Sequence, residues 1–243
     1  MRKVEQVIGE WFTRIETRLT VYGPAQTAAD EVIGASVPVV ENYLTSACLL
    51  ATKEGILPSK ALLRPVGEFI GKLRWCVAGG TKEEIYDRIQ RWRKSSWKNY
   101  KSYWEAVRKT CRRSDCAQID EQIREADRKL AQMTSFREFP TARQILDSGF
   151  SEETAVRLGI YTQYLGATHI DILTLAQTVA QEGGCTEYVG DLVGGDSGLE
   201  RDLLSLACLY AGTISKYYGW DYADILSEYK SLTNSEDGKP TEQ

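Results

Sequence analysis

Apolar residues recur at helical spacing along most of the chain, and glycine and proline divide the pattern into segments. Residues 4–19 carry aliphatic and aromatic side chains three or four positions apart, and Gly23 and Pro24 follow them. This pattern predicts an amphipathic helix at the start of the chain. A second, more apolar helix is expected to begin at Pro38 and to end before Gly55.

The next two helices carry boundary signals. Ser59 can cap a helix that runs to the glycines at 79 and 80, and Pro65 inside it is expected to kink it because the proline ring removes a backbone donor. Thr81 with Glu84 forms a capping-box pattern. A long helix is therefore expected from this point to about Cys111.

The remaining sequence continues the helical pattern with one irregular region. A charged surface helix is expected over about residues 116–133, and further helices over about 153–182, 199–218 and 222–232. The glycines between 183 and 198 indicate connecting loops, because no Lys-Ser or Lys-Thr follows them to complete a phosphate-binding loop.

The periodicity also predicts the fold class. No segment alternates apolar and polar residues with the period of two that predicts strands. We therefore expect an all-α fold, an irregular multi-helix bundle in which long neighbouring helices pack antiparallel across short turns. Residues 1–234 are expected to form one domain, and residues 235–243 a polar C-terminal tail.

Composition favours a soluble, globular protein. Hydrophobic residues make up 42% and charged residues 26% of the 243 positions, which is typical of that class. No run approaches the roughly 20 uninterrupted apolar residues of a membrane span, and the first residues lack the apolar core of a signal peptide. We expect a cytoplasmic protein that does not enter a membrane.

The six cysteines indicate neither disulfides nor a metal site. Cys48, Cys76 and Cys208 stand in apolar helical sequence, where a free thiol behaves as a small hydrophobic group. Cys111 and Cys116 are close together, but a zinc ion would need at least two further ligands from a chain with one histidine. We expect reduced thiols, no metal and no cofactor.

Two short polar patterns interrupt the apolar helices and are the best candidates for chemistry. Arg64 and Glu68 are four residues apart, so they lie on one helix face and can pair. Tyr161 and His169, the only histidine, belong to a later apolar helical segment. If the two helices meet, these four side chains form one buried polar cluster.

Such a cluster would hold the parts of a metal-independent ribonuclease. An imidazole beside a carboxylate and a guanidinium can act as a general base on a 2′-hydroxyl, and the guanidinium can stabilise the charged phosphorane. The alternative is structural: Arg64 and Glu68 form a buried ion pair that helps select helix register, and His169 is a satisfied core or interface residue. Both interpretations stay open.

The helix expected after Thr81 is strongly basic. Between Arg88 and Arg113, ten lysines and arginines stand against a single acid, Glu105; this balance of +9 leaves −13 for the remainder of a chain with net charge −4. Aromatic residues are interleaved with the cations, as in surfaces that combine phosphate contacts with base stacking. The expected nucleic-acid-binding residues are Arg88, Arg91, Arg93, Lys94, Trp97, Lys98 and Lys101.

Two other interpretations of this basic helix remain. Its cations can form a solvated face that acidic helices balance, or they can dock an acidic protein partner. In the first case one side of the helix would turn to the core, and the core-facing residues would be Ile85, Ile89, Trp92, Tyr103 and Val107.

The same residues resemble the pattern of a family of uncharacterised bacterial all-helical proteins. The pattern comprises a Leu-Leu-Arg run with a glutamate four positions later, a basic helix, and a tyrosine-rich helix that ends in Thr-His. Here these parts are Arg64 with Glu68, the region from Arg88, and residues 161–169. The similarity covers about residues 36–180.

That family is distantly similar to the HEPN helical domains of prokaryotic defence and toxin systems, many of which are dimeric ribonucleases. In those domains an arginine precedes the histidine by about six residues, whereas here Arg157 is twelve positions before His169. The resemblance implies a nucleic-acid-directed protein of defence type, a ribonuclease that acts through Arg64 and His169 and could form a homodimer. The second hypothesis is a non-catalytic interaction module that binds an acidic protein.

Overall fold

The computed structural model describes residues 1–53, 56–111, 116–140, 179–182, 185–188 and 195–234. Seven helices lie within these residues, which confirms the predicted all-α, multi-helix fold. They are α1 (Arg2–Tyr22), α2 (Ala28–Lys53), α3 (Ile56–Val77), α4 (Lys82–Thr110), α5 (Cys116–Ala131), α10 (Gly195–Tyr218) and α11 (Ala223–Asn234).

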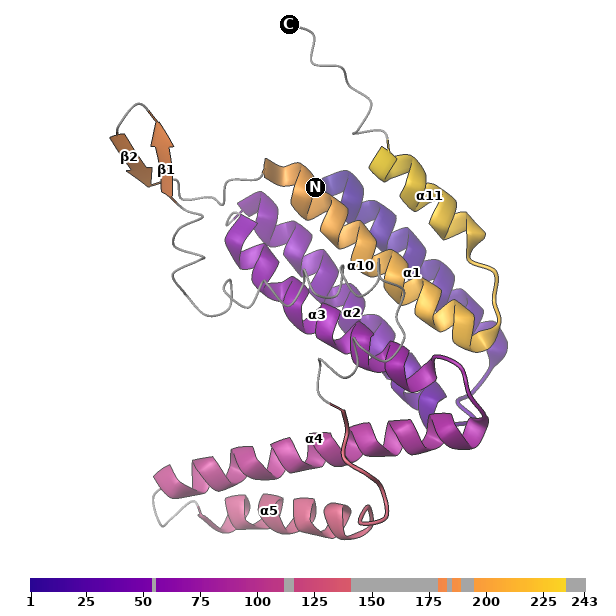
Figure 1. Ribbon diagram of the computed structural model, residues 1–243, viewed down its shortest axis with the longest axis vertical. Helices are drawn as coiled ribbons and strands as arrows, with labels where there is room; N and C mark the ends of the chain where they lie inside the picture. Colours follow the sequence, from indigo (N-terminus) through magenta and orange to yellow (C-terminus); the bar gives the residue numbers. More distant parts are fainter. Residues whose placement is uncertain (54–55, 112–115, 141–178, 183–184, 189–194, 235–243) are drawn as a thin grey trace, which may run out of the picture.

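Four of the helices form a ring around the main core. Helix α2 packs against α1 and α3, and α10 closes the ring by contacting both α3 and α1, although it follows them by more than a hundred residues. Helix α11 covers the outside of α10 (Figure 1). The largest fully buried side chains of this body include Trp11, Phe12, Ile33, Leu44, Leu63, Ile70, Leu73 and Tyr210.

Helices α4 and α5 form an antiparallel hairpin that lies across one end of the body (Figure 1). Helix α4 packs on α3 and α2 through its first half, where Ile89 and Gln90 are its only buried residues. The second half of α4 packs on α5. We call α4 and α5 together the arm.

The start of α4 confirms the predicted capping box. The Thr81 hydroxyl oxygen accepts a hydrogen bond from the Glu84 backbone N–H at 3.3 Å, and the Glu84 carboxylate accepts one from the Thr81 N–H at 2.8 Å. The helix then continues to Thr110, as the sequence predicted.

Two predicted helix starts are wrong. Helix α2 begins at Ala28 instead of Pro38, because Thr27 and Asp30 cap each other's backbone N–H groups at 2.7 and 3.2 Å. Pro38 lies on the exposed side of α2, where water can satisfy the carbonyl that lacks its helical donor. Ser59 is not a cap: it lies inside α3 and is fully buried.

The helix predicted to reach Glu182 is wrong over its last residues. Val179–Glu182 (β1) pairs antiparallel with Cys185–Tyr188 (β2), with Glu182 opposite Cys185. The pairing leaves two residues between the strands, and both are glycines, a composition that favours a tight hairpin over a continuing helix.

Candidate functional site

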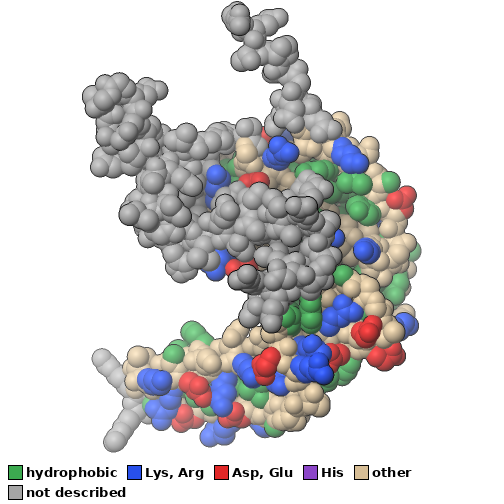
Figure 2. All heavy atoms as spheres, in the orientation of Figure 1, with side chains coloured by type: hydrophobic (Ala, Val, Ile, Leu, Met, Phe, Trp, Pro, Cys, Tyr) green, Lys and Arg blue, Asp and Glu red, His purple; other side chains and the backbone are tan. Residues whose placement is uncertain are grey.

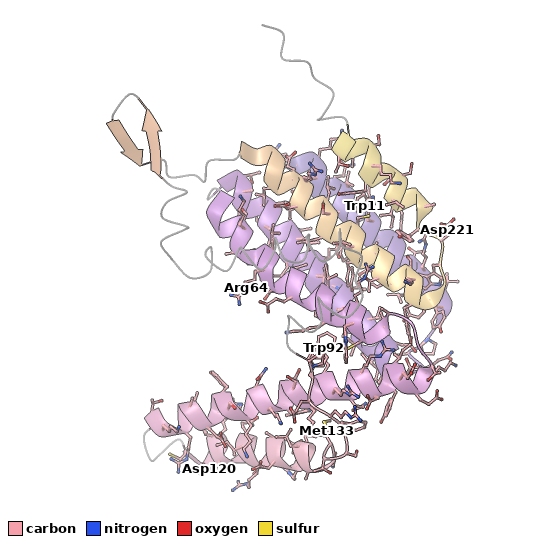
Figure 3. The ribbon with its side chains drawn as sticks, viewed as in Figure 1. Trp11, Arg64, Trp92, Asp120, Met133 and Asp221 are labelled. Atoms are coloured by element: carbon pink, nitrogen blue, oxygen red, sulfur yellow. The ribbon has the colours of Figure 1, made fainter. Side chains whose placement is uncertain are left out.

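Arg64 and Glu68 form the predicted pair on α3. The Arg64 Nε lies 2.9 Å from the Glu68 Oε1, one helical turn apart. Their side chains are 24% and 36% exposed, so the pair is half-buried at the edge of the body instead of enclosed, and Figure 3 shows Arg64 at this edge of α3. The Glu68 carboxylate therefore restricts the orientation of the Arg64 guanidinium.

Tyr161 and His169 lie outside the described residues. The polar cluster that would join them to Arg64 and Glu68 therefore stays a prediction, and so does the ribonuclease chemistry that depends on it.

Arg88 connects the arm to the body through hydrogen bonds. Its guanidinium donates to the backbone carbonyls of Trp75, Ala78 and Gly79 at 3.0, 3.1 and 2.6 Å. These carbonyls belong to the end of α3 and the turn after it, where helical partners are missing. Arg88 thus completes the hydrogen bonding of the α3 C-terminus and has a structural role.

The other five predicted nucleic-acid-binding cations form ion pairs within the protein. Arg91 pairs with Asp87 at 2.7 Å in the same helix. The remaining pairs join elements that are distant in sequence: Arg93 with Glu31 at 2.7 Å, Lys94 and Lys98 with Glu138 at 3.6 and 2.6 Å, and Lys101 with Asp127 at 2.6 Å. Positive and negative side chains accordingly alternate over the arm (Figure 2).

These pairs set the charge state of the arm. The hydrogen bond from Lys101 to Asp127 raises the pKa of the lysine, and the bond from Lys98 lowers the pKa of Glu138. Lys101 and Glu138 therefore stay charged over a wider pH range than free side chains of their kind. A phosphate backbone that bound here would have to replace these carboxylates.

The aromatic residues of α4 pack largely against one another. Trp97, Tyr100 and Trp104 follow each other in edge-to-face contacts, with ring centroids 5.4 and 6.0 Å apart, and the Tyr100 hydroxyl donates to Gln122 of α5. Tyr103 would face the core if the cations formed a solvated face, but it is 61% exposed because the core ends before this part of the arm.

A groove opens where α2, α3 and α4 meet. Its volume is about 520 Å³, within the size range of ligand sites. Phe69 of α3 and Trp92 of α4 both line the groove and pack with ring centroids 5.4 Å apart, and Figure 3 labels Trp92 on α4. The main lining side chains are Val39, Tyr43, Val66, Phe69, Trp92 and Trp97.

Helix α2 supplies one wall because it has two apolar faces. One face, with Ile33, Val37 and Leu44, is buried in the body. The other carries Val39 and Tyr43 one turn apart, and Val39 is 53% exposed. Among the described helices, α2 alone is long and apolar enough, over Ala28–Thr52, to cross a membrane, a test that the core helix of a soluble protein also passes.

The lining of the groove is largely apolar and includes few polar side chains. The Ser36 hydroxyl is engaged with the Tyr210 hydroxyl at 2.7 Å and with the Ile33 carbonyl. Arg93 lies in the wall, and Pro65, the neighbour of Arg64, lines it as well. In the described part of the chain, no three His, Cys, Asp or Glu side chains gather in a way that could hold a metal ion.

Sequence reasoning missed this groove. The available signal was the run from Val32 to Tyr43, which is apolar on more sides of the helix than one core contact requires. No family model, curated protein or solved structure matches this chain.

Proposed function

We propose that this protein is a non-catalytic helical interaction module, and that the groove between α2, α3 and α4 binds an amphipathic helix of an acidic partner protein. The observation that carries the proposal is the second apolar face of α2, left open with Val39 and Tyr43 at its centre. An exposed apolar surface that lines a groove is typical of a binding site.

The shape of the groove favours a helix as the occupant. Its walls are three helices, and the exposed residues of α2 are one turn apart, so they match the spacing of side chains on a second helix. A helix laid in such a groove inserts its apolar residues and leaves its polar face in water.

Charge favours an acidic flank on that helix. Arg93 lies in one wall and pairs with Glu31, which is 62% exposed. Arg64 stands beside the other wall, and its pair with Glu68 is half-buried. An exposed pair such as Arg93–Glu31 contributes only about 0 to 1 kcal/mol, so an incoming carboxylate can replace Glu31 at small cost.

The pairing of the α4 cations supports this choice over RNA. Every cation predicted to contact phosphate already has a carboxylate or carbonyl partner within the protein. The cytoplasmic location, the homodimer and the ribonuclease activity of Arg64, Glu68, Tyr161 and His169 remain predictions. RNA cleavage by the purified chain with EDTA, compared with His169→Ala, tests the ribonuclease directly.

The binding test uses two designed peptides of about 18 residues, about five helical turns, with the same leucine face and either glutamate or lysine on the flanks. We expect the acidic peptide to change Trp92 and Trp97 fluorescence and to bind more tightly than the basic one. Single-stranded RNA is the third probe. Tighter binding of RNA than of either peptide, with a steep salt dependence, would contradict the proposal.

Matched variants locate the site. Val39→Glu places a charge on the groove wall, whereas Val21→Glu changes a valine that is 84% exposed on α1 and does not line the groove. Loss of one buried valine contact is worth about 1.5 kcal/mol or more, so Val39→Glu should weaken peptide binding about tenfold or more and Val21→Glu should not. Light scattering that shows a Val39-dependent dimer would assign the groove to a second copy instead.

A further inference from the structure

A second cavity, of about 400 Å³, lies at the end of the body near the joint with the arm. It is enclosed by the end of α1, the start of α2, the start of α4 and the end of α10. The floor is apolar and includes Ala29, Val77 and Ile85. This cavity is separate from the groove, with which it shares no lining residue.

Tyrosines form the walls of the cavity. Tyr22 and Tyr86 are exposed, and Tyr22 contacts Tyr218 with ring centroids 4.5 Å apart. Tyr218 is in turn stacked on Trp220 at 4.5 Å with an interplanar angle of 17°. Tyr218 thus packs against both Tyr22 and Trp220, and the exposed surfaces of Tyr22 and Tyr86 are the ones available to stack on a flat ring.

Tyr217 adds a hydrogen-bonding group to this wall. Its hydroxyl lies 3.1 Å from the Thr27 hydroxyl. Burial raises the pKa of Tyr217, so the phenol stays protonated at neutral pH and can donate as well as accept.

Two lysines that line the cavity belong to none of the ion pairs described above. Lys82 begins α4 and Lys216 lies in the last turn of α10, and neither has a carboxylate within ion-pair distance among the described residues. This sets them apart from the six predicted cations of α4, each of which has a partner.

Acidic groups also lie near the cavity. Glu83 interacts electrostatically with Lys82, and, besides burial, the charge of Asp30 contributes to raising the pKa of Tyr217 and Tyr218. The Glu84 carboxylate accepts the Thr81 N–H in the capping box, and the buried Asp30 carboxylate accepts the Gln26 and Thr27 N–H groups at 3.0 and 2.7 Å. Two lysines and several aromatic rings thus line one small space.

We infer that this cavity binds a nucleoside monophosphate, with its phosphate between Lys82 and Lys216 and its base against the tyrosine wall. Compact ammonium groups are suited to phosphate, and aromatic faces stack on any base. The volume is that of a site for one small molecule. A nucleotide can contact the lysines through its phosphate and the tyrosines through its base at the same time.

The test is calorimetric titration of the full chain with AMP, GMP, CMP and UMP, and with adenosine and inorganic phosphate as the two halves of the ligand. We expect at least one nucleotide to bind and both halves to bind at least tenfold more weakly. Binding of phosphate as tight as that of every nucleotide would overturn the role of the tyrosines, and no binding of any nucleotide at millimolar concentration would overturn the inference.

Variants with a matched control separate the site from general charge effects. Lys82→Ala with Lys216→Ala removes both ammonium groups at exposed positions, and Lys109→Ala with Lys230→Ala removes two exposed lysines that do not line the cavity. The first pair should weaken nucleotide binding at least tenfold with an unchanged melting temperature, and the second should leave it unaltered. Equal losses in both variants would contradict the site.

Discussion

The body and the arm of this protein are held together in different ways. In the body, four helices enclose large side chains such as Trp11, Phe12 and Tyr210 with no measurable exposure. In the arm, beyond Gln90, α4 buries no residue, and α5 buries only Cys116, Ile119 and Ala126. Ion pairs such as Lys101–Asp127 and Arg108–Asp120 connect the two arm helices.

This difference explains how a strongly basic helix can belong to an acidic protein: the predicted cations of α4 are paired within the molecule. Burial of apolar area is nondirectional and strong, so it determines the body. The arm has little apolar area to bury, so its carboxylates are placed where they neutralise α4, and the groove forms at the boundary of the two regions. Apolar packing and charge pairing should therefore respond to different perturbations.

The largest contrast is expected from one substitution made in each region. Ile70→Ala in α3 removes a side chain that is 1% exposed, and Ile119→Ala in α5 removes one that is 7% exposed at the edge of the arm. The tightly packed body can relax less than the arm into the cavity that the truncated side chain leaves. Ile70→Ala should therefore lower the free energy of unfolding by about 4 kcal/mol and Ile119→Ala by about 2 kcal/mol. Urea unfolding of the two variants measures both values, and equal losses would break the comparison.

A smaller effect is expected at the joint between the regions. Thr81→Ala removes the side-chain acceptor of the capping box at the start of α4, which should lower the free energy of unfolding by about 1 kcal/mol. Thr81→Ser keeps the acceptor and is the control. If both variants lowered the free energy of unfolding equally, the side-chain cap at Thr81 would not be what stabilises the start of α4.

High salt is expected to destabilise the arm more than the body. Raising NaCl from about 0.05 to about 1 M shortens the Debye length from more than 10 Å to about 3 Å, which screens the Lys101–Asp127 and Lys98–Glu138 pairs. Backbone amides of α5 should then exchange with solvent faster, while those of α1 and α10 keep their protection. Hydrogen-exchange mass spectrometry measures this, and a uniform change along the chain would contradict it.

The smallest effect is a pH dependence on the outside of the body. Hydrogen bonds from Trp11 at 2.6 Å and from Arg14 at 2.9 Å hold the pKa of Glu228 below its ordinary 4.5. A lowered pKa contributes stability above pH 4.5 and loses it as the pH falls through the folded value. Glu228→Gln should thus be less stable than the parent at pH 7, and the difference should shrink toward pH 3 in urea titrations.

Local features of this fold were readable from the sequence. The capping box at Thr81 and the Arg64–Glu68 pair each depend on residues within one turn of each other, where spacing alone fixes the geometry. The start of α2 was missed because Pro38 is a stronger visible signal than the Thr27–Asp30 cap.

Features that depend on distant contacts were not readable. The partners of Arg93 and Lys101 are 62 and 26 residues away, so the sequence showed an excess of cations and not the carboxylates that meet them. The same holds for the groove, whose walls come from three helices. Burial raises the pKa of the Cys48 and Cys76 thiols to about 12, in keeping with their apolar helical context.

The most direct test of the proposed function is the footprint of the bound acidic peptide by hydrogen-exchange mass spectrometry. Protection should appear in α2 around Val39 and Tyr43, in α3 around Phe69 and in the first half of α4, and it should vanish in Val39→Glu. Protection confined to the second half of α4 and to α5, with no change around Val39, would contradict the groove as the binding surface.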